Sequence, residues 1–284
     1  MKIVRLHSFL LFVIGLAIAW LGTAGPAYGE TANSLWIGTD NASDRLVLNT
    51  DRTGALLESV GPVEATGFAI DLKANTIYFG TSNGTITPRN LTTLAASASF
   101  SALGTEDMTF GGNFIWRAGT TGPGASPIII KTDPGTHVSS QAFTVPFQAL
   151  GIAWDGSGLW VGEFIINGLI QRFDPSGNAT GQSFNTSGNF VNGGLAYDNT
   201  DGTLYIGTVG KVYHYTTTGT QLGVFNIPAM DGRFVDGLEF EPRPVVGVPA
   251  LSHSGFWFLA LTLVLVGYVL MRRAKKVARL PSSQ

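Results

Sequence analysis

Five short apolar segments recur along this 284-residue chain at nearly constant spacing. Each has an aromatic residue at its second position and ends in glycine or alanine. The segments are residues 35–38, 77–80, 115–118, 159–162 and 204–207, so their starts lie 42, 38, 44 and 45 positions apart. A period of about 40–45 residues built from short β runs is typical of β-propeller blades.

The sequence around each segment repeats as well. An apolar run that ends in aspartate precedes three of them, at residues 67–71, 151–155 and 194–198, and residues 107–111 are a degraded copy. A third run follows each segment, then a turn rich in aspartate, proline and glycine, then an outer run that ends in Phe100, Phe143, Phe184 or Phe225. The aspartates are interpreted as turn formers, and the pattern predicts four strands per unit.

One repeat is divided between the two ends of this region. It opens with a second strand, residues 34–39, and ends with a first strand, residues 235–241, which no second strand follows. Pairing of these two segments would complete one blade and leave no free sheet edge between the first and last blades. We therefore expect an all-β, five-bladed β-propeller over residues 30–242; the alternative is a solenoid, for which we find no capping units.

Composition agrees with this fold and excludes several classes of function. The chain has 37 glycines and only 13% charged residues, which disfavours a helical enzyme. It has no cysteine, so disulfides, thiolate metal sites and cysteine nucleophiles are excluded. Between the two basic chain ends lie 19 acidic and 10 basic residues, a formal charge of −9. Nucleic acid is therefore not an expected partner.

The N-terminal segment has the three parts of a secretory signal peptide. Lys2 and Arg5 precede an apolar run over residues 9–21, and small residues lead to an expected cleavage site after Gly29. We expect residues 1–29 to be removed on export. The alternative is an uncleaved membrane anchor, although the apolar run is short for a span.

The C-terminal segment predicts a membrane anchor. Residues 255–271 carry no charge and are long enough to cross a bilayer core. A basic tail, residues 272–284, follows at once and contains Arg272, Arg273, Lys275 and Lys276. Clustered basic residues stay on the cytoplasmic side, so the body is expected outside the cytoplasm.

The linker, residues 243–254, contains a short motif directly before the predicted span. Its residues, with the first glycine of the span, are Val248, Pro249, Ala250, Leu251, Ser252 and Gly255. This arrangement resembles the IPTL-CTERM group of bacterial sorting signals, relatives of PEP-CTERM. Ala250 and Ser254 depart from that pattern, where threonine and tryptophan are usual. The resemblance implies processing by an exosortase-type protease, with the body retained on the membrane, released, or moved to the cell surface.

The repeats also resemble known propeller families. The fourth unit, with residues 151–155, 158–162 and 172–178, is similar to the NHL repeat and more distantly to SMP-30/gluconolactonase-like propellers. The fifth unit is nearly as similar. Propellers with this pattern have unrelated activities, so the resemblance implies a fold and leaves the function open.

The sequence offers few groups for catalysis. Residues 80–84 match the letters of a Gly-x-Ser-x-Gly nucleophile motif, but that motif requires a helix where a strand is predicted. His137 falls in a turn and His214 in the third strand of its unit, which is distant from the channel of a propeller, so neither is an expected catalytic base.

A set of oxygen-bearing side chains lies where each unit enters its first strand, close to the channel mouth. The set is Glu64, Glu106, Asp107, Gln148, Asn192 and Asp236. Gluconolactonase-type propellers hold a divalent cation there with glutamate, asparagine and aspartate, and such oxygens suit Ca²⁺ or another divalent cation such as Mg²⁺. The alternative is a solvated polar funnel.

Two functions follow from these observations. The first is a non-catalytic binding module of the bacterial envelope or extracellular matrix, monomeric, with a polysaccharide or protein ligand. The second is a divalent-metal-dependent lactonase or lyase that works at the channel mouth. The absence of a nucleophile and base pattern favours the first.

Overall fold

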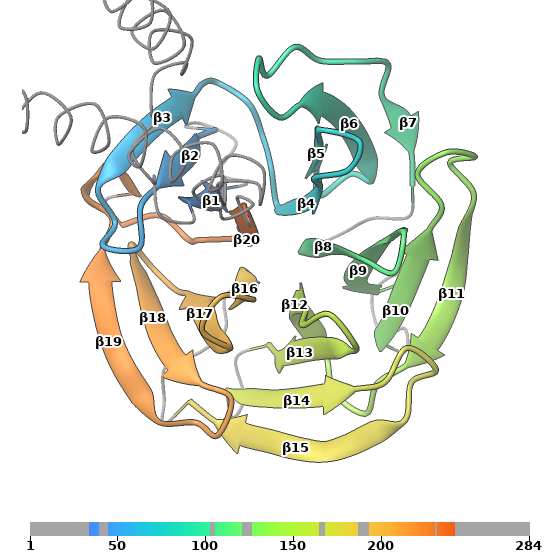
Figure 1. Ribbon diagram of the computed structural model, residues 1–284, viewed down its shortest axis with the longest axis vertical. Coiled ribbons are helices and arrows are strands. Elements are labelled where there is room, and N and C mark those ends of the chain that lie inside the picture. The colour runs from blue at the N-terminus through green and yellow to red at the C-terminus, as the bar shows by residue number, and fades with distance from the viewer. Residues whose placement is uncertain are drawn as a thin grey trace, which may run out of the picture. The chain divides into compact units, whose positions relative to one another are not determined.

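The chain forms five four-stranded antiparallel sheets arranged around a central axis, which is a five-bladed β-propeller (Figure 1). The computed structural model describes residues 34–39, 45–102, 106–120, 127–164, 168–186, 193–230 and 232–241. The predicted signal peptide, linker, membrane span and basic tail all lie outside these residues. Within them, no helix has the length and apolar character needed to cross a bilayer.

The strands of each blade follow one another from the axis outward. Blade 1 has β20 (Gly237–Glu241), β1 (Ser34–Gly38), β2 (Val47–Thr50) and β3 (Leu56–Val60). Blade 2 has β4 (Gly67–Asp71), β5 (Thr76–Gly80), β6 (Thr85–Asn90) and β7 (Phe100–Ser101). Blade 3 has β8 (Met108–Gly111), β9 (Phe114–Thr120), β10 (Pro127–Thr132) and β11 (Ser139–Thr144). Blade 4 has β12 (Ala149–Trp154), β13 (Leu159–Glu163), β14 (Leu169–Phe173) and β15 (Ala179–Asn185). Blade 5 has β16 (Leu195–Asp198), β17 (Thr203–Gly207), β18 (Lys211–Thr216) and β19 (Gln221–Asn226), followed by the short 3₁₀ helix η1 (Pro228–Met230).

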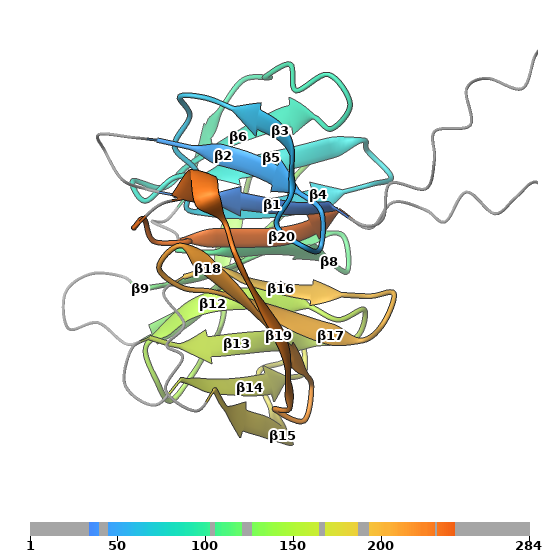
Figure 2. The ribbon, with the colours of Figure 1, turned by 90° about the vertical axis from the view of Figure 1, so that its left-hand side faces the viewer.

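The ring closes within blade 1, as the divided repeat predicts. β20 pairs antiparallel with β1 over their full lengths, with Ser34 opposite Glu241 and Gly38 opposite Gly237. Figure 2 shows the two strands side by side, although they come from opposite ends of the described chain. The first and last blades therefore share one sheet, and neither contributes an open inner edge.

Burial falls from the axis outward within each blade. All five residues of β1 and of β20 are buried, whereas β3 is largely exposed. The aromatic residues of the five recurrent segments all lie in the core, with exposed fractions of 6% or less; they are Trp36, Tyr78, Trp116, Trp160 and Tyr205. Each of these large side chains belongs to an apolar cluster shared by two neighbouring blades, and its burial helps to hold the ring together.

A second repeated contact joins the outer parts of neighbouring blades. In blade 4, Gly177 in the turn between the two outer strands lies against Phe143 on the outer strand of blade 3. Gly219 in blade 5 lies in the same way against Phe184 of blade 4. Both glycines have a positive φ, near +90°, which explains the choice of residue. In blade 3 His137 replaces glycine: its φ is 61°, and its ring stacks on Phe100 of blade 2 at 4.0 Å.

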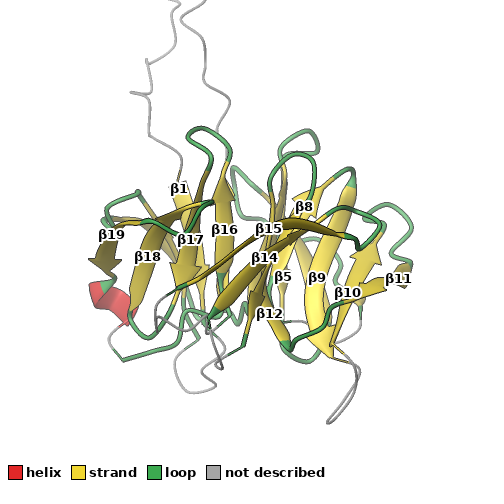
Figure 3. Cartoon of the chain, turned by 90° about the horizontal axis from the view of Figure 1, so that it is seen from below, coloured by secondary structure: helices red, strands yellow, loops and turns green. Residues whose placement is uncertain are grey.

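The connections gather on two faces of the ring, seen from the side in Figure 3. On the first, which we call the turn face, lie the turns from the first to the second strand and from the third to the fourth strand of each blade. The other connections lie on the opposite face. Ser34 and Glu241 are paired at the turn-face end of blade 1, so both ends of the described propeller lie on the turn face.

Candidate functional site

Asp107, one of the predicted channel residues, lies at the axis and joins three blades. It precedes β8 and is fully buried. Its Oδ1 accepts a hydrogen bond from the Met108 N–H at 2.9 Å. Its Oδ2 accepts from Ile152 of β12 at 3.2 Å and from Leu195 of β16 at 2.8 Å. Burial raises the pKa of Asp107 well above its usual range, and these three N–H donors only partly offset that effect.

Glu239 of β20 reaches the same region from blade 1. It accepts hydrogen bonds from the Phe240 N–H at 3.1 Å, from the Phe110 N–H and from the Thr109 hydroxyl. The Thr109 hydroxyl oxygen in turn accepts from the Trp154 N–H at 3.1 Å. Blades 1 and 3 are not neighbours in the ring, so the contact between Glu239 and Thr109 crosses the axis.

The charge state of Glu239 follows from this burial. Only 8% of the residue is exposed, and its Oε2 has no hydrogen-bond partner within the described part of the chain. Burial raises the pKa of Glu239 to about 8, although its hydrogen bonds act in the opposite direction. Charge repulsion from Glu239 adds to the rise of the Asp107 pKa. The repeat pattern offers no reason to select Glu239, which lies inside an ordinary buried strand.

Both carboxylate oxygens of Glu64 are engaged by residues of blades 1 and 2. Its Oε2 forms an ion pair with Arg45 at 2.9 Å. Its Oε1 accepts hydrogen bonds from the Ser82 hydroxyl at 3.0 Å and from the Ser82 N–H at 3.3 Å. Ser82 itself lies in the turn between β5 and β6, so the Gly-x-Ser-x-Gly letters mark a hairpin, as predicted.

The remaining predicted channel residues differ in their surroundings. Glu106 and Gln148 are exposed, and Asp236 is half-buried. Asn192 lies outside the described residues. In the described part of the chain, no three histidine, aspartate or glutamate side chains are grouped so that they could hold a metal ion. Calcium binding at the channel mouth stays a prediction.

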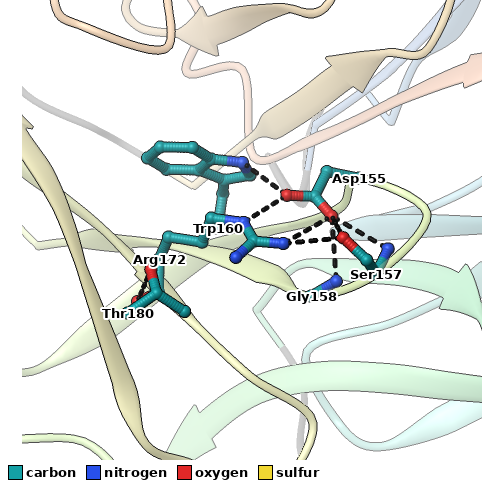
Figure 4. Close-up of polar contacts among 6 residues, drawn as sticks. All are labelled: Asp155, Ser157, Gly158, Trp160, Arg172 and Thr180. Atoms are coloured by element: carbon teal, nitrogen blue, oxygen red, sulfur yellow. Dashed lines mark hydrogen bonds and ion pairs between the residues drawn. The ribbon is translucent and has the colours of Figure 1, made fainter.

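Asp155, which directly follows β12 of blade 4, is the centre of a cluster of polar contacts that extends beyond its predicted turn (Figure 4). As predicted, Asp155 accepts hydrogen bonds from the turn N–H groups of Ser157 and Gly158. It also accepts from the Trp160 indole at 3.1 Å and forms an ion pair with Arg172, 2.5 Å from Nε. Burial raises the pKa of Asp155, but the hydrogen bonds from Arg172 and the turn outweigh it and leave the pKa below its usual range. Both oxygens are engaged, so the cluster stabilises the blade.

The two histidines of the body have structural surroundings. The Nε2 atom of His214 lies 2.8 Å from the Thr203 hydroxyl, and its ring stacks on Tyr205 at 4.2 Å. Burial lowers the pKa of His214. His137 occupies a turn position against Phe100 of the preceding blade. Both rings are used in packing between strands or blades.

An open cleft lies on the outer part of blade 3, at the turn face. Its volume is about 350 Å³, within the range of small-ligand sites. Its lining residues are Phe114, Lys131, Asp133, Thr136, Val138 and Ser140. They come from β9, from β10 and its following turn, and from the start of β11. Lys131 is opposite Trp116 of β9 and Ser140 of β11, and Phe114 lies two residues before Trp116. Since residues two apart along a strand point to the same face, Phe114, Lys131 and Ser140 share one face of the sheet.

The polar groups of the cleft are only partly engaged by the protein. The ammonium of Lys131 lies 4.4 Å from the centre of the Phe114 ring, and no carboxylate forms an ion pair with it in the described part of the chain. The Oδ1 atom of Asp133 accepts from the N–H groups of Gly135 and Thr136. The Ser140 side chain is exposed and makes no hydrogen bond to another described residue. No sequence pattern marks this cleft, because its residues meet only through strand pairing.

Comparison with known proteins finds a structural likeness and no family. No model of a known protein family matches the chain, and no curated protein matches it. Among solved structures, the chain is similar to one chain of a nidogen/laminin complex, with 14% sequence identity and a TM-score of 0.48. The match covers 73% of this chain and 97% of that one.

Proposed function

We propose that this protein is an exported binding module of the bacterial envelope that acts without catalysis. Residues 255–271 anchor it in the membrane, and the propeller lies outside the cytoplasm. The sorting motif before the span directs processing by an exosortase-type protease. The ligand is an envelope polysaccharide or protein.

The cleft on blade 3 is the observation that carries the binding role. It combines an apolar side, one ammonium, one carboxylate and hydroxyl groups around an open space of ligand size. Polar groups that border an open space and keep hydrogen-bonding capacity beyond their contacts within the protein are suited to recognising a ligand. The sorting motif and basic tail in the sequence support the location, since they predict export and an outside orientation.

Binding is tested with the full-length chain in detergent micelles. We expect saturable binding by isothermal titration to a polysaccharide or protein fraction of the envelope, with the ligand recovered chemically unchanged. Metal-dependent conversion of a lactone or polysaccharide would instead favour the lactonase or lyase alternative. Failure to bind any envelope fraction would contradict the proposed function.

The anchor is tested by replacing Arg272, Arg273, Lys275 and Lys276 together with glutamine. The positive charges hold the tail on the cytoplasmic side, so their loss should reduce the fraction of chains in the expected orientation. A C-terminal epitope should become accessible to protease added outside the cell. An epitope as protected as in the wild type would count against this topology.

A further inference from the structure

We propose that the blade 3 cleft binds an uncharged sugar unit of a polysaccharide; this inference rests on the binding role proposed above. The cleft lies at the rim of the propeller and is separate from the axial carboxylates. It is built from Phe114, Lys131, Asp133, Thr136, Val138 and Ser140.

The polar lining matches a ligand that carries several hydroxyl groups. Lys131 supplies hydrogen-bond donors, the carboxylate of Asp133 supplies acceptors, and Ser140 can do both. Each sugar hydroxyl also donates one hydrogen bond and accepts others. A ligand with acceptors alone or donors alone would leave part of this lining without a partner, which costs free energy once the groups lose their water.

The apolar lining matches the C–H face of a sugar ring. Val138 is 65% exposed and presents its apolar side chain to the open side of the cleft. Phe114 adds an aromatic ring whose position is fixed by its contacts with Lys131 and Trp116. A sugar has both hydroxyl edges and C–H faces, so one unit can satisfy both parts of the lining.

Charge favours a neutral sugar over an acidic one. Lys131 and Asp133 are the charged side chains of the lining, so the formal charge of the cleft is zero. Backbone hydrogen bonds from Thr136 and Gly135 keep the pKa of Asp133 below its usual range, so its negative charge persists at neutral pH. The body as a whole carries a formal charge of −9, from 19 acidic and 10 basic residues. A polyanion would therefore be repelled by the body and by Asp133.

The size and openness of the cleft set the length of the segment that it recognises. About 350 Å³ is close to the lower limit of ligand pockets, which suits a single unit and its immediate linkage. Because the cleft is open to solvent and not enclosed, a bound unit can remain part of a longer chain. Binding should therefore not require a free chain end.

The inference is tested by titrating the full-length protein in micelles with four neutral polysaccharides: dextran, laminarin, mannan and galactan. Polygalacturonate serves as the acidic comparison. We expect at least one neutral polymer to bind, and polygalacturonate to bind at least tenfold more weakly. Ser140→Ala and Lys131→Met should each weaken neutral binding by about fivefold or more, since each removes hydrogen bonds to a hydroxyl.

Lys211→Ala is the matched control, because it removes the same charge from an exposed position on β18 of blade 5. It should leave binding unchanged.

Circular dichroism and melting curves establish that each variant is folded; Ser140→Ala is informative even if Lys131→Met destabilises blade 3. Tighter binding of polygalacturonate, or neutral binding that neither cleft variant weakens, would overturn this inference while leaving a binding function. If none of the polysaccharides binds, a sugar ligand is wrong, and a protein ligand from the envelope titration would still support the proposed function.

Discussion

At the scale of single residues, Glu239 makes the stability of the propeller depend on pH. Its pKa is about 8 in the folded chain and near 4.5 when exposed. Between about pH 4.5 and pH 8, the Glu239 carboxyl is therefore protonated in the folded chain and ionised in the unfolded chain. The contribution of Glu239 to stability is therefore full below about pH 4.5 and falls as pH rises toward 8, by up to about 1.4 kcal/mol per pH unit.

Glu239→Gln should remove this loss, because the amide stays neutral and its oxygen still accepts from the Phe240 N–H. We expect the variant and the wild type to be similar at pH 4.5, and the variant to be more stable at pH 8. Urea unfolding at the two pH values measures the difference. Glu58→Gln, on the exposed strand β3, is the control and should show no such change. If Glu239→Gln and the wild type differed in stability by the same amount at both pH values, protonation of Glu239 would not be linked to folding.

At the scale of elements, the contact between a turn glycine and a phenylalanine of the preceding blade predicts an uneven response to alanine. Gly177 has a φ of 90°, and an added Cβ would lie 2.5 Å from the Cβ and Cγ atoms of Phe143. Gly181 has a similar φ of 84°, but an added Cβ would meet nothing within 4 Å. Both alanine variants therefore carry the backbone cost, about 1 kcal/mol, and only one carries the clash.

We expect Gly177→Ala to reduce the free energy of unfolding by about 1–3 kcal/mol more than Gly181→Ala, which is the usual cost of overpacking. Chemical unfolding of the two variants side by side provides the measurement. Gly181→Ala, on β15, is the control, because it carries the same backbone cost of a positive φ without the clash. Equal losses of unfolding free energy would mean that Phe143 can move away from the added Cβ without reducing stability.

At the scale of the whole molecule, closure of the ring depends on β20. Its Leu238 and Phe240 belong to the core between blades 1 and 5, where the Phe240 ring lies 4.6 Å from that of Tyr205. A chain that ends after Phe234 lacks this strand, so the apolar strand β1 becomes a free edge. We expect it to aggregate. A chain that ends after Glu241 keeps the closure and should remain monomeric, as measured by light scattering.

The architecture could be predicted because its signals are local and repeated. The aromatic residue of each recurrent segment, such as Trp36 or Trp160, marks a buried strand, and the divided repeat determines which strands close the ring. Strand pairing follows from such alternation, so the five blades and their closure agree with the sequence. The candidate site was less predictable, because the other described residues of the predicted channel set have different surroundings from Asp107; they are Glu64, Glu106, Gln148 and Asp236.

The sequence by itself determined the blade number, the order of the strands and the turns. Only the tertiary structure decided which carboxylates lose water at the axis, since Glu239 and Thr109 meet across the ring from blades far apart in sequence. The same holds for the cleft, where strand register brings Phe114, Lys131 and Ser140 together. A repeat pattern in the sequence indicates which side chains each strand buries within its own blade. The charge state of a buried group and the shape of a cleft depend on long-range contacts that no local pattern encodes.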